Sequence, residues 1–136
     1  MTQISKHISY DEAVNSNTAT KLKIANKPNA KQLENMKEVA ELCFEPMRAY
    51  VGRPLAVNSF FRSAALNTAV KGSKTSQHME GKAIDIDSGN KEDNRKMFNF
   101  AKANLEFDQL INEYDYKWIH ISFNKAKNRK QVLVVK

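Results

Sequence analysis

The sequence predicts an α+β fold in which N-terminal helices pack on a small, mostly antiparallel sheet formed by the second half of the chain. Three observations support this prediction. Between positions 33 and 50, apolar residues recur every three or four positions, which is the period of an α-helix. Several segments after position 82 instead alternate apolar and polar residues, which is the period of a strand. A length of 136 residues, 41% of them hydrophobic, is enough to bury the core of one domain, which we expect to span residues 1–136.

The helices are predicted from their caps and from the period of their apolar residues. Ser9 and Glu12 have the spacing of a capping box, which begins a short helix. Asn29 should cap the long amphipathic helix, and Gly52 should end it. Pro46 should distort the final third of that helix, because proline removes a backbone donor from the hydrogen-bond ladder. The predicted helices, in chain order, cover residues 9–17, 29–51, 63–70 and 93–103.

The predicted strands cover residues 55–59, 82–87, 107–111, 118–123 and 131–135. Within 82–87 both isoleucines lie on one face of the strand, so Asp85 points from the other face. Within 118–123, Phe123 and the isoleucines share a face, so His120 points from the opposite, polar face. Residues 112–117 should form the hairpin that joins two of these strands.

Charge and composition limit the classes of partner. The formal net charge of +7, from 22 Lys and Arg against 15 Asp and Glu, favours an anionic partner such as an acidic cell wall. A solvated lysine-rich surface is the alternative explanation. Nucleic acid is a weaker hypothesis, because no recognition motif accompanies the charge and no run interleaves basic residues with aromatics. The single cysteine, Cys43, lies in an apolar segment and is predicted to be a core residue.

The N-terminal segment and the hydropathy of the chain bear on its location. The first residues contain no apolar run of the kind found in a secretory signal peptide. No stretch of the sequence approaches the length of a transmembrane helix, so we expect no membrane partner.

Two imidazoles and a carboxylate are candidate metal ligands: His78, Asp85 and His120. If the strands that carry Asp85 and His120 are close neighbours, both side chains can reach one ion, and His78 can fold back from a turn at Gly81. Three ligands of this kind leave one position of a tetrahedral zinc ion open, which distinguishes catalytic from structural sites. Each of these residues alone has an ordinary explanation as a surface or core side chain. His7, which has no such pattern near it, is assigned that explanation.

The segments around the candidate ligands resemble the motifs of a known peptidase family. Residues 76–85 read SQHMEGKAID and residues 118–122 read WIHIS. In this order they resemble the zinc-binding motifs of the D-alanyl-D-alanine carboxypeptidase and L-alanyl-D-glutamate endopeptidase family, which includes phage endolysins and bacterial cell-wall enzymes. Residues 58–63, NSFFRS, are similar to the Ser-Gly-Tyr-Arg-Ser segment of that family. With weaker similarity at 24–28 and 107–111, the resemblance extends from about Ile24 to Phe123.

The resemblance implies a hedgehog/D-Ala-D-Ala peptidase-like fold and a Zn²⁺ ion held by His78, Asp85 and His120. It also implies that Arg62 and Ser76 lie near the substrate. A guanidinium suits a peptide carboxylate or carbonyl, although Arg62 could equally form a structural ion pair. Ser76 could hydrogen-bond the substrate, or simply orient the loop that carries His78.

The catalytic base is the point at which this sequence departs from the family pattern. Many relatives carry an acidic residue three positions before the final histidine, where this chain has Lys117. A hairpin centred on Asp115 would place Glu113 opposite Lys117, so Glu113 is the predicted base. Asp115 is the second candidate, and both acids could instead be charges at the tip of the hairpin.

These observations predict a zinc metallopeptidase that hydrolyses peptidoglycan stem peptides with a metal-activated water, as a cell-wall hydrolase and possible bacteriophage endolysin. The alternative is a non-catalytic zinc-binding or virion- or wall-binding module on the same scaffold. We expect a monomer that is made in the cytoplasm without a signal peptide and meets the cell wall after release. The bond that is cut, and the choice between endopeptidase and carboxypeptidase, stay open at this point.

Overall fold

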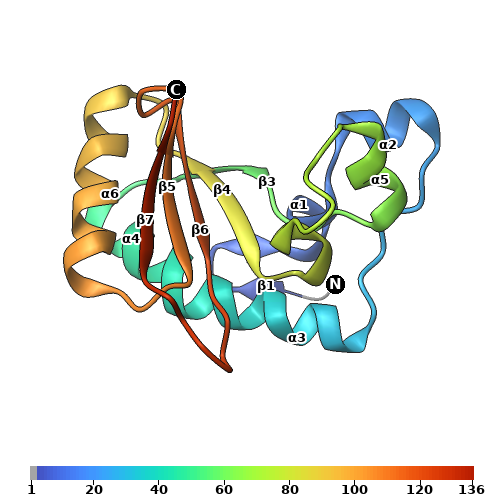
Figure 1. Cartoon of the computed structure of the whole chain (residues 1–136), viewed down its shortest axis with the longest axis horizontal. Helices are drawn as coiled ribbons and strands as arrows, with labels where there is room; N and C mark the ends of the chain where they lie inside the picture. The colour runs from blue at the N-terminus through green and yellow to red at the C-terminus, as the bar shows by residue number, and fades with distance from the viewer. Residues whose placement is uncertain (1–2) are drawn as a thin grey trace.

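A five-stranded sheet lies at the centre of the computed structural model, which describes residues 3–136 (Figure 1). Its strand order is β3-β4-β6-β5-β7. The strands are β3 (Ala56–Ser59), β4 (Ala83–Asp87), β5 (Gln109–Glu113), β6 (Trp118–Ser122) and β7 (Gln131–Val135). Neighbouring strands are antiparallel except for β5 and β7, which are parallel. The predicted α+β fold with a mostly antiparallel sheet is therefore confirmed.

Helices and one small hairpin surround this sheet. They are β1 (Gln3–Ser5), β2 (Ile8–Ser9), α1 (Tyr10–Val14), α2 (Asn17–Leu22), α3 (Ala30–Val39), the π-helical turn η1 (Ala40–Phe44), α4 (Glu45–Val51), α5 (Ala64–Ala69), the 3₁₀ turn η2 (Gln77–Glu80) and α6 (Lys91–Asn104). In Figure 1, α6 and α4 lie at the sheet's β5–β7 end, whereas α2 and α5 form a separate group beyond β3. The candidate ligands lie between these two groups.

The first predicted helix differs from the structure. Ser9 caps α1 as expected, with its Oγ accepting the Glu12 N–H at 3.1 Å, but the helix ends at Val14. The predicted continuation to Asn17 is wrong, because Ser16 adopts extended backbone and caps a second short helix, α2. Its Oγ accepts the Ala19 N–H at 3.1 Å.

The long helix has the distortion that Pro46 predicts. Asn29 and Gln32 form a reciprocal capping box at its start. Pro46 has no N–H to donate to the preceding turn, and the helix widens there into the π-helical turn η1. The Glu45 N–H accordingly donates to the Ala40 carbonyl, five residues earlier.

The core lies between the helices and one face of the sheet. The buried strand residues on this face include Ile84, Ile86, Ile119 and Ile121, all with no exposed surface. Cys43 packs in the same core, as predicted, and burial raises the pKa of its thiol to about 12. No helix within residues 3–136 is both long and apolar enough to cross a membrane.

Candidate metal centre

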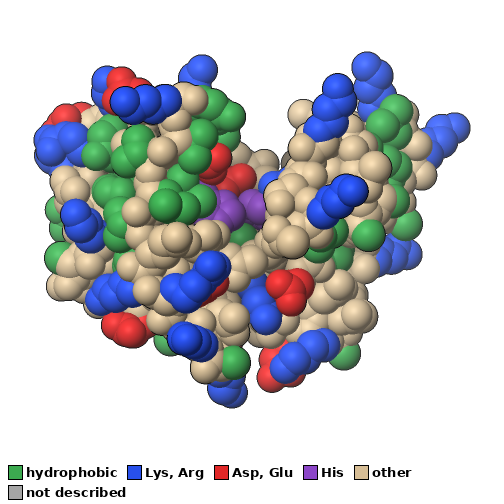
Figure 2. Space-filling view, viewed as in Figure 1, with side chains coloured by type: hydrophobic (Ala, Val, Ile, Leu, Met, Phe, Trp, Pro, Cys, Tyr) green, Lys and Arg blue, Asp and Glu red, His purple; other side chains and the backbone are tan. Residues whose placement is uncertain are grey.

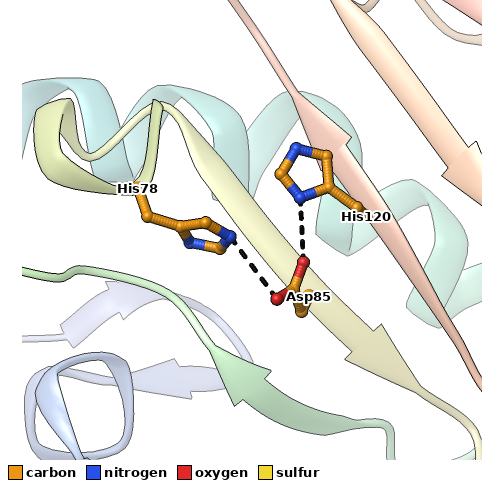
Figure 3. A group of neighbouring side chains, drawn as sticks. All are labelled: His78, Asp85 and His120. Carbon is orange, nitrogen blue, oxygen red and sulfur yellow. Dashed lines mark hydrogen bonds and ion pairs between the residues drawn. The ribbon is translucent and has the colours of Figure 1, made fainter. Parts of the chain in front are cut away.

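The three candidate ligands converge on the face of the sheet opposite the core. Asp85 on β4 pairs in register with His120 on β6, so the two side chains share this face. His78 reaches the same point from η2, as Figure 3 shows. One donor atom from each residue lies within 4.8 Å of the others. The structure thus brings together the three residues that the sequence singled out.

The turn η2 holds His78 in place through its own cap and through α3. The Ser76 Oγ accepts the His78 N–H at 3.2 Å, so the loop-orienting role considered for Ser76 is present in the structure. Side-chain amides of Gln32 and Asn35 on α3 donate to the carbonyls of Met79 and Glu80, each at 3.0 Å. The backbone of the ligand-bearing turn is therefore fixed from two sides.

The orientation of the His78 ring favours a metal. Its Nδ1 lies 2.7 Å from the Phe60 carbonyl oxygen, and because a carbonyl can only accept a hydrogen bond, Nδ1 is the protonated donor. The other ring nitrogen, Nε2, faces Asp85 and is buried without a hydrogen-bond partner among the described residues. A neutral imidazole oriented by a carbonyl at its second nitrogen is the arrangement that zinc-binding histidines require.

The spacing of the donor atoms also fits zinc. The His78 Nε2 lies 3.4 Å from the Asp85 Oδ2, and the His120 Nδ1 lies 2.9 Å from the Asp85 Oδ1. A tetrahedral zinc ion with nitrogen and oxygen ligands separates its donor atoms by about 3.4 Å. Burial alone would raise the pKa of Asp85, but the two imidazoles outweigh it and hold that pKa well below its ordinary value. The carboxylate is therefore ionised, as a metal ligand must be.

Glu113 lies beside these ligands, although in a different register from the one predicted. The expected pairing with Lys117 is wrong, since Glu113 pairs with Trp118 across β5 and β6. A shift of one residue moves a side chain to the other face of a sheet, and the observed register puts Glu113 on the face of His120. The Trp118 Nε1 donates to the Glu113 Oε2 at 2.9 Å.

The surroundings of Glu113 raise the pKa of its carboxyl group. Burial, and then the charge of Asp85, raise the pKa of Glu113 above its ordinary value. Its side chain is half-buried and lines the same cleft as the three candidate ligands. Carboxylates with a raised pKa in a cleft are typical of catalytic acids and bases.

Asp115, the second candidate base, lies elsewhere. It occupies the exposed tip of the β5–β6 hairpin, where its Oδ2 pairs with the Lys91 Nζ at 2.5 Å. It does not line the cleft that contains Glu113. Of the two acids, only Glu113 lines the cleft that contains the candidate ligands.

Arg62 lines the same cleft as Glu113. Its Nη1 donates to the Asn67 Oδ1 at 3.1 Å, and it forms no ion pair with a carboxylate of residues 3–136, so the structural ion pair considered above is absent. Burial lowers the pKa of the guanidinium, while the charges of Asp85 and Glu113 act in the opposite direction. A Cβ at Gly72 would lie 2.7 Å from the Arg62 Nη1, so glycine there leaves room for the guanidinium.

The cleft encloses about 1000 Å³ and includes residues that the sequence did not indicate. Trp118 and the Phe60 carbonyl orient Glu113 and His78. Asp108 is buried and accepts hydrogen bonds from Gln77, next to His78, and from the Arg129 guanidinium. Trp118 stands in a recognised motif and could have been found there. The Asp108–Arg129 pair joins distant segments and leaves no local signal.

A family model described as Peptidase M15 matches residues 6–122 of the chain. A search of curated proteins found no match. The matched span contains η2, β4 and β6, and so includes every segment that contributes a candidate ligand.

Proposed function

This chain belongs to the peptidase M15 family, whose members are zinc-dependent peptidases, and we propose that it hydrolyses the stem peptides of peptidoglycan. The observation that carries the proposal is the cluster of buried His78, buried Asp85 and partly buried His120, in which the His78 Nε2 has no hydrogen-bond partner within residues 3–136. In this proposal the three residues hold Zn²⁺. The ion, when bound, supplies Lewis acidity that polarises a carbonyl and lowers the pKa of water.

Glu113 is the proposed general base. It shares a sheet face with His120, so its carboxylate can accept a proton from the attacking water and deliver it to the leaving amine. The Trp118 indole N–H donates to the Glu113 Oε2. This hydrogen bond orients the carboxylate and leaves its Oε1 free to accept the proton.

Arg62 is the proposed substrate-binding residue. It lines the same cleft as Glu113 and forms no ion pair within residues 3–136, so its guanidinium is available to a carboxylate or carbonyl of the peptide. Ser76 lines the same cleft, and its Oγ accepts a hydrogen bond from the His78 N–H, so we assign it to loop orientation.

The decisive experiment compares two substitutions on the same hairpin. Glu113→Gln should keep stoichiometric zinc but release fragments from purified peptidoglycan at least about 100-fold more slowly, the usual contribution of a general base. Asp115→Asn should hydrolyse peptidoglycan at the wild-type rate, because that carboxylate lies outside the cleft. Wild-type activity in the Glu113 variant would remove this residue from the mechanism.

The second candidate is a zinc-containing module that binds the wall without cutting it. It is favoured by Lys117, which stands where relatives carry an acid. Wild-type protein that binds zinc and sediments with peptidoglycan, yet releases no fragments detectable by mass spectrometry, would support this module. If fragments appear, their masses identify the bond that is cut.

A further inference from the structure

An apolar shelf borders the metal centre on the sheet side of the cleft. It consists of Ile111, Tyr114, Trp118, Leu133 and Val135. The pairing of the strands places it on the ligand-bearing face in two rows. In one row, β5 residue Ile111 lies between His120 and Leu133.

The second row contains the proposed base. Glu113 lies between Trp118 on β6 and Val135 on β7. Residues in register on neighbouring strands share a face, so the shelf continues directly from the metal centre to the β7 edge of the sheet. Tyr114 extends it at the end of β5, where its ring centroid lies 5.1 Å from that of Trp118.

No element among residues 3–136 covers this shelf. Its five side chains stand apart from the buried core, which lies on the other face of the sheet. Tyr114 is 50% exposed and Val135 is 37% exposed. Figure 2 shows hydrophobic side chains on the sheet-side bank, next to the histidines at the floor of the cleft. A contiguous exposed apolar surface beside a reactive site is typical of a binding surface.

The apolar shelf differs in charge from the rest of the cleft lining. Elsewhere in the lining of the cleft, Arg62, Lys71 and Lys127 carry positive charge, which suits the carboxylates of a stem peptide. The shelf instead offers two aromatic rings with polar tips and three aliphatic side chains, with Glu113 as the one charge among them. Such a surface matches a neutral ligand with apolar faces and a hydroxylated edge.

We infer that the shelf binds sugar rings of the glycan strand to which the stem peptide is attached. A pyranose ring has C–H groups on its faces and hydroxyls around its edge, so it can stack on Trp118 and Tyr114. The stem peptide is joined to the glycan through its amino end, which places a sugar within a few residues of a peptide bond at the metal centre. This inference rests on the proposed function for its choice of polymer.

The single tryptophan of the chain gives a direct test, because it lies in the shelf. Soluble glycan fragments from which the peptides have been removed should change Trp118 fluorescence saturably. Tyr114→Asn combined with Val135→Ser should weaken the affinity about tenfold, the loss expected from about 1.4 kcal/mol of contact energy. Asparagine is chosen because Tyr114 has a φ of 54°.

Val134→Ser is the matched control. Val134 is on the same strand and 60% exposed, but it pairs with Asn112 on the opposite face of the sheet. This variant should bind the glycan fragments with wild-type affinity. No saturable change with wild-type protein, or equal affinity of the double variant, would overturn the inference.

Two other occupants are outcomes of the same test. Concentration-dependent dimers in analytical ultracentrifugation that disappear on Val135→Ser would assign the shelf to a second copy of the chain and overturn the inference. So would a fluorescence change with phosphatidylglycerol vesicles and none with glycan. None of these measurements involves hydrolysis, so a negative result is distinct from a failure of the Glu113→Gln experiment.

Discussion

The pairing of Glu113 with Trp118 matters at the scale of single residues because it sets both the position and the pKa of the proposed base. The indole Nε1 donates to the Glu113 Oε2, and a hydrogen bond to the ionised form lowers the pKa of a carboxyl. Burial and the charge of Asp85 act in the opposite direction and prevail. Trp118 therefore limits how far the pKa of Glu113 rises.

Trp118→Phe tests this role. The phenyl ring keeps most of the apolar contact but donates no hydrogen bond, so the pKa of Glu113 should rise further above its ordinary value. A base must be deprotonated to act, and the acidic limb of the kcat/KM profile should move to higher pH. The measurement is the pH dependence of peptide hydrolysis by both proteins. Superimposable acidic limbs would mean that the Trp118 hydrogen bond does not tune the base.

At the scale of elements, the position of His78 depends on how closely η2 packs against α3. Gly81 ends η2 with a φ of 74°, and a Cβ there would lie 2.5 Å from the Gln32 backbone oxygen. Gly52 has a similar φ of 77° with nothing within 4 Å of a Cβ. The two glycines therefore separate the effect of backbone conformation from the effect of crowding.

Alanine substitutions should show this separation. Gly52→Ala should lower the free energy of unfolding by about 1 kcal/mol, the usual difference for a left-handed position. Gly81→Ala should lower it by a further 1–3 kcal/mol or so, because the backbone of α3 must move to admit the methyl group. Urea denaturation measures both values. Zinc affinity should fall only in Gly81→Ala, and equal effects of the two substitutions would show that η2 tolerates displacement.

Asp108 joins three segments at the edge of the cleft. Its carboxylate accepts hydrogen bonds from the Arg129 guanidinium and from the Gln77 amide. The Arg129 side chain in particular holds the pKa of Asp108 well below its ordinary value. A carboxyl with a lowered pKa in the folded state stabilises the fold above its unfolded pKa, about 3.9, and this contribution is lost as the pH falls further.

Asp108→Asn should therefore lower the free energy of unfolding at pH 7 by roughly 1–3 kcal/mol, since the Arg129 guanidinium and the Gln77 amide lose a charged acceptor. The difference in free energy of unfolding between wild type and variant should shrink as the pH falls from 5 to about 3. In this range the Asp108 carboxyl of the unfolded wild-type chain becomes protonated, whereas that of the folded protein stays ionised. Urea denaturation across this range checks the prediction. A difference that stays constant with pH would show that the ion pair contributes little.

The clustering of the three candidate ligands could be predicted from the sequence, whereas the residues that support them could not. His78, Asp85 and His120 lie in short motifs, and strand alternation alone places the last two on polar faces. The Glu113 register was missed because the residues of the tight hairpin, Tyr114 to Tyr116, all have positive φ without being glycine. Nothing local signals such a turn.

The predicted boundaries of helices and strands are wrong where burial in the tertiary structure competes with the local sequence pattern. The strand predicted at 107–111 lies two residues later in the structure, as β5 (Gln109–Glu113). Phe107 suggested an earlier start because it is apolar and fully buried, but it precedes the first paired residue of the strand. The helix α2 was missed because its six residues are too few to show a helical period. The sheet as a whole was predictable because period-two alternation recurs in several segments.

At the scale of the whole molecule, the candidate metal ligands come from parts of the fold that are otherwise separate. His78 belongs to η2, which α3 holds, whereas Asp85 and His120 belong to the centre of the sheet. The unfolded chain does not hold these three donors together. Binding of zinc to the folded state should therefore stabilise the entire domain.

Zinc should raise the free energy of unfolding by about 2.7 kcal/mol when its free concentration is 100 times the dissociation constant, and a chelator should remove this increment. His78→Ala and His120→Ala should each abolish the increment, since two remaining ligands bind the ion weakly. His7→Ala is the matched control, because His7 is the third histidine of the chain and pairs with Glu45 outside the site. Thermal and urea denaturation with zinc or EDTA give the values. An increment that survives in His78→Ala, or that disappears in His7→Ala, would place the stabilising ion elsewhere.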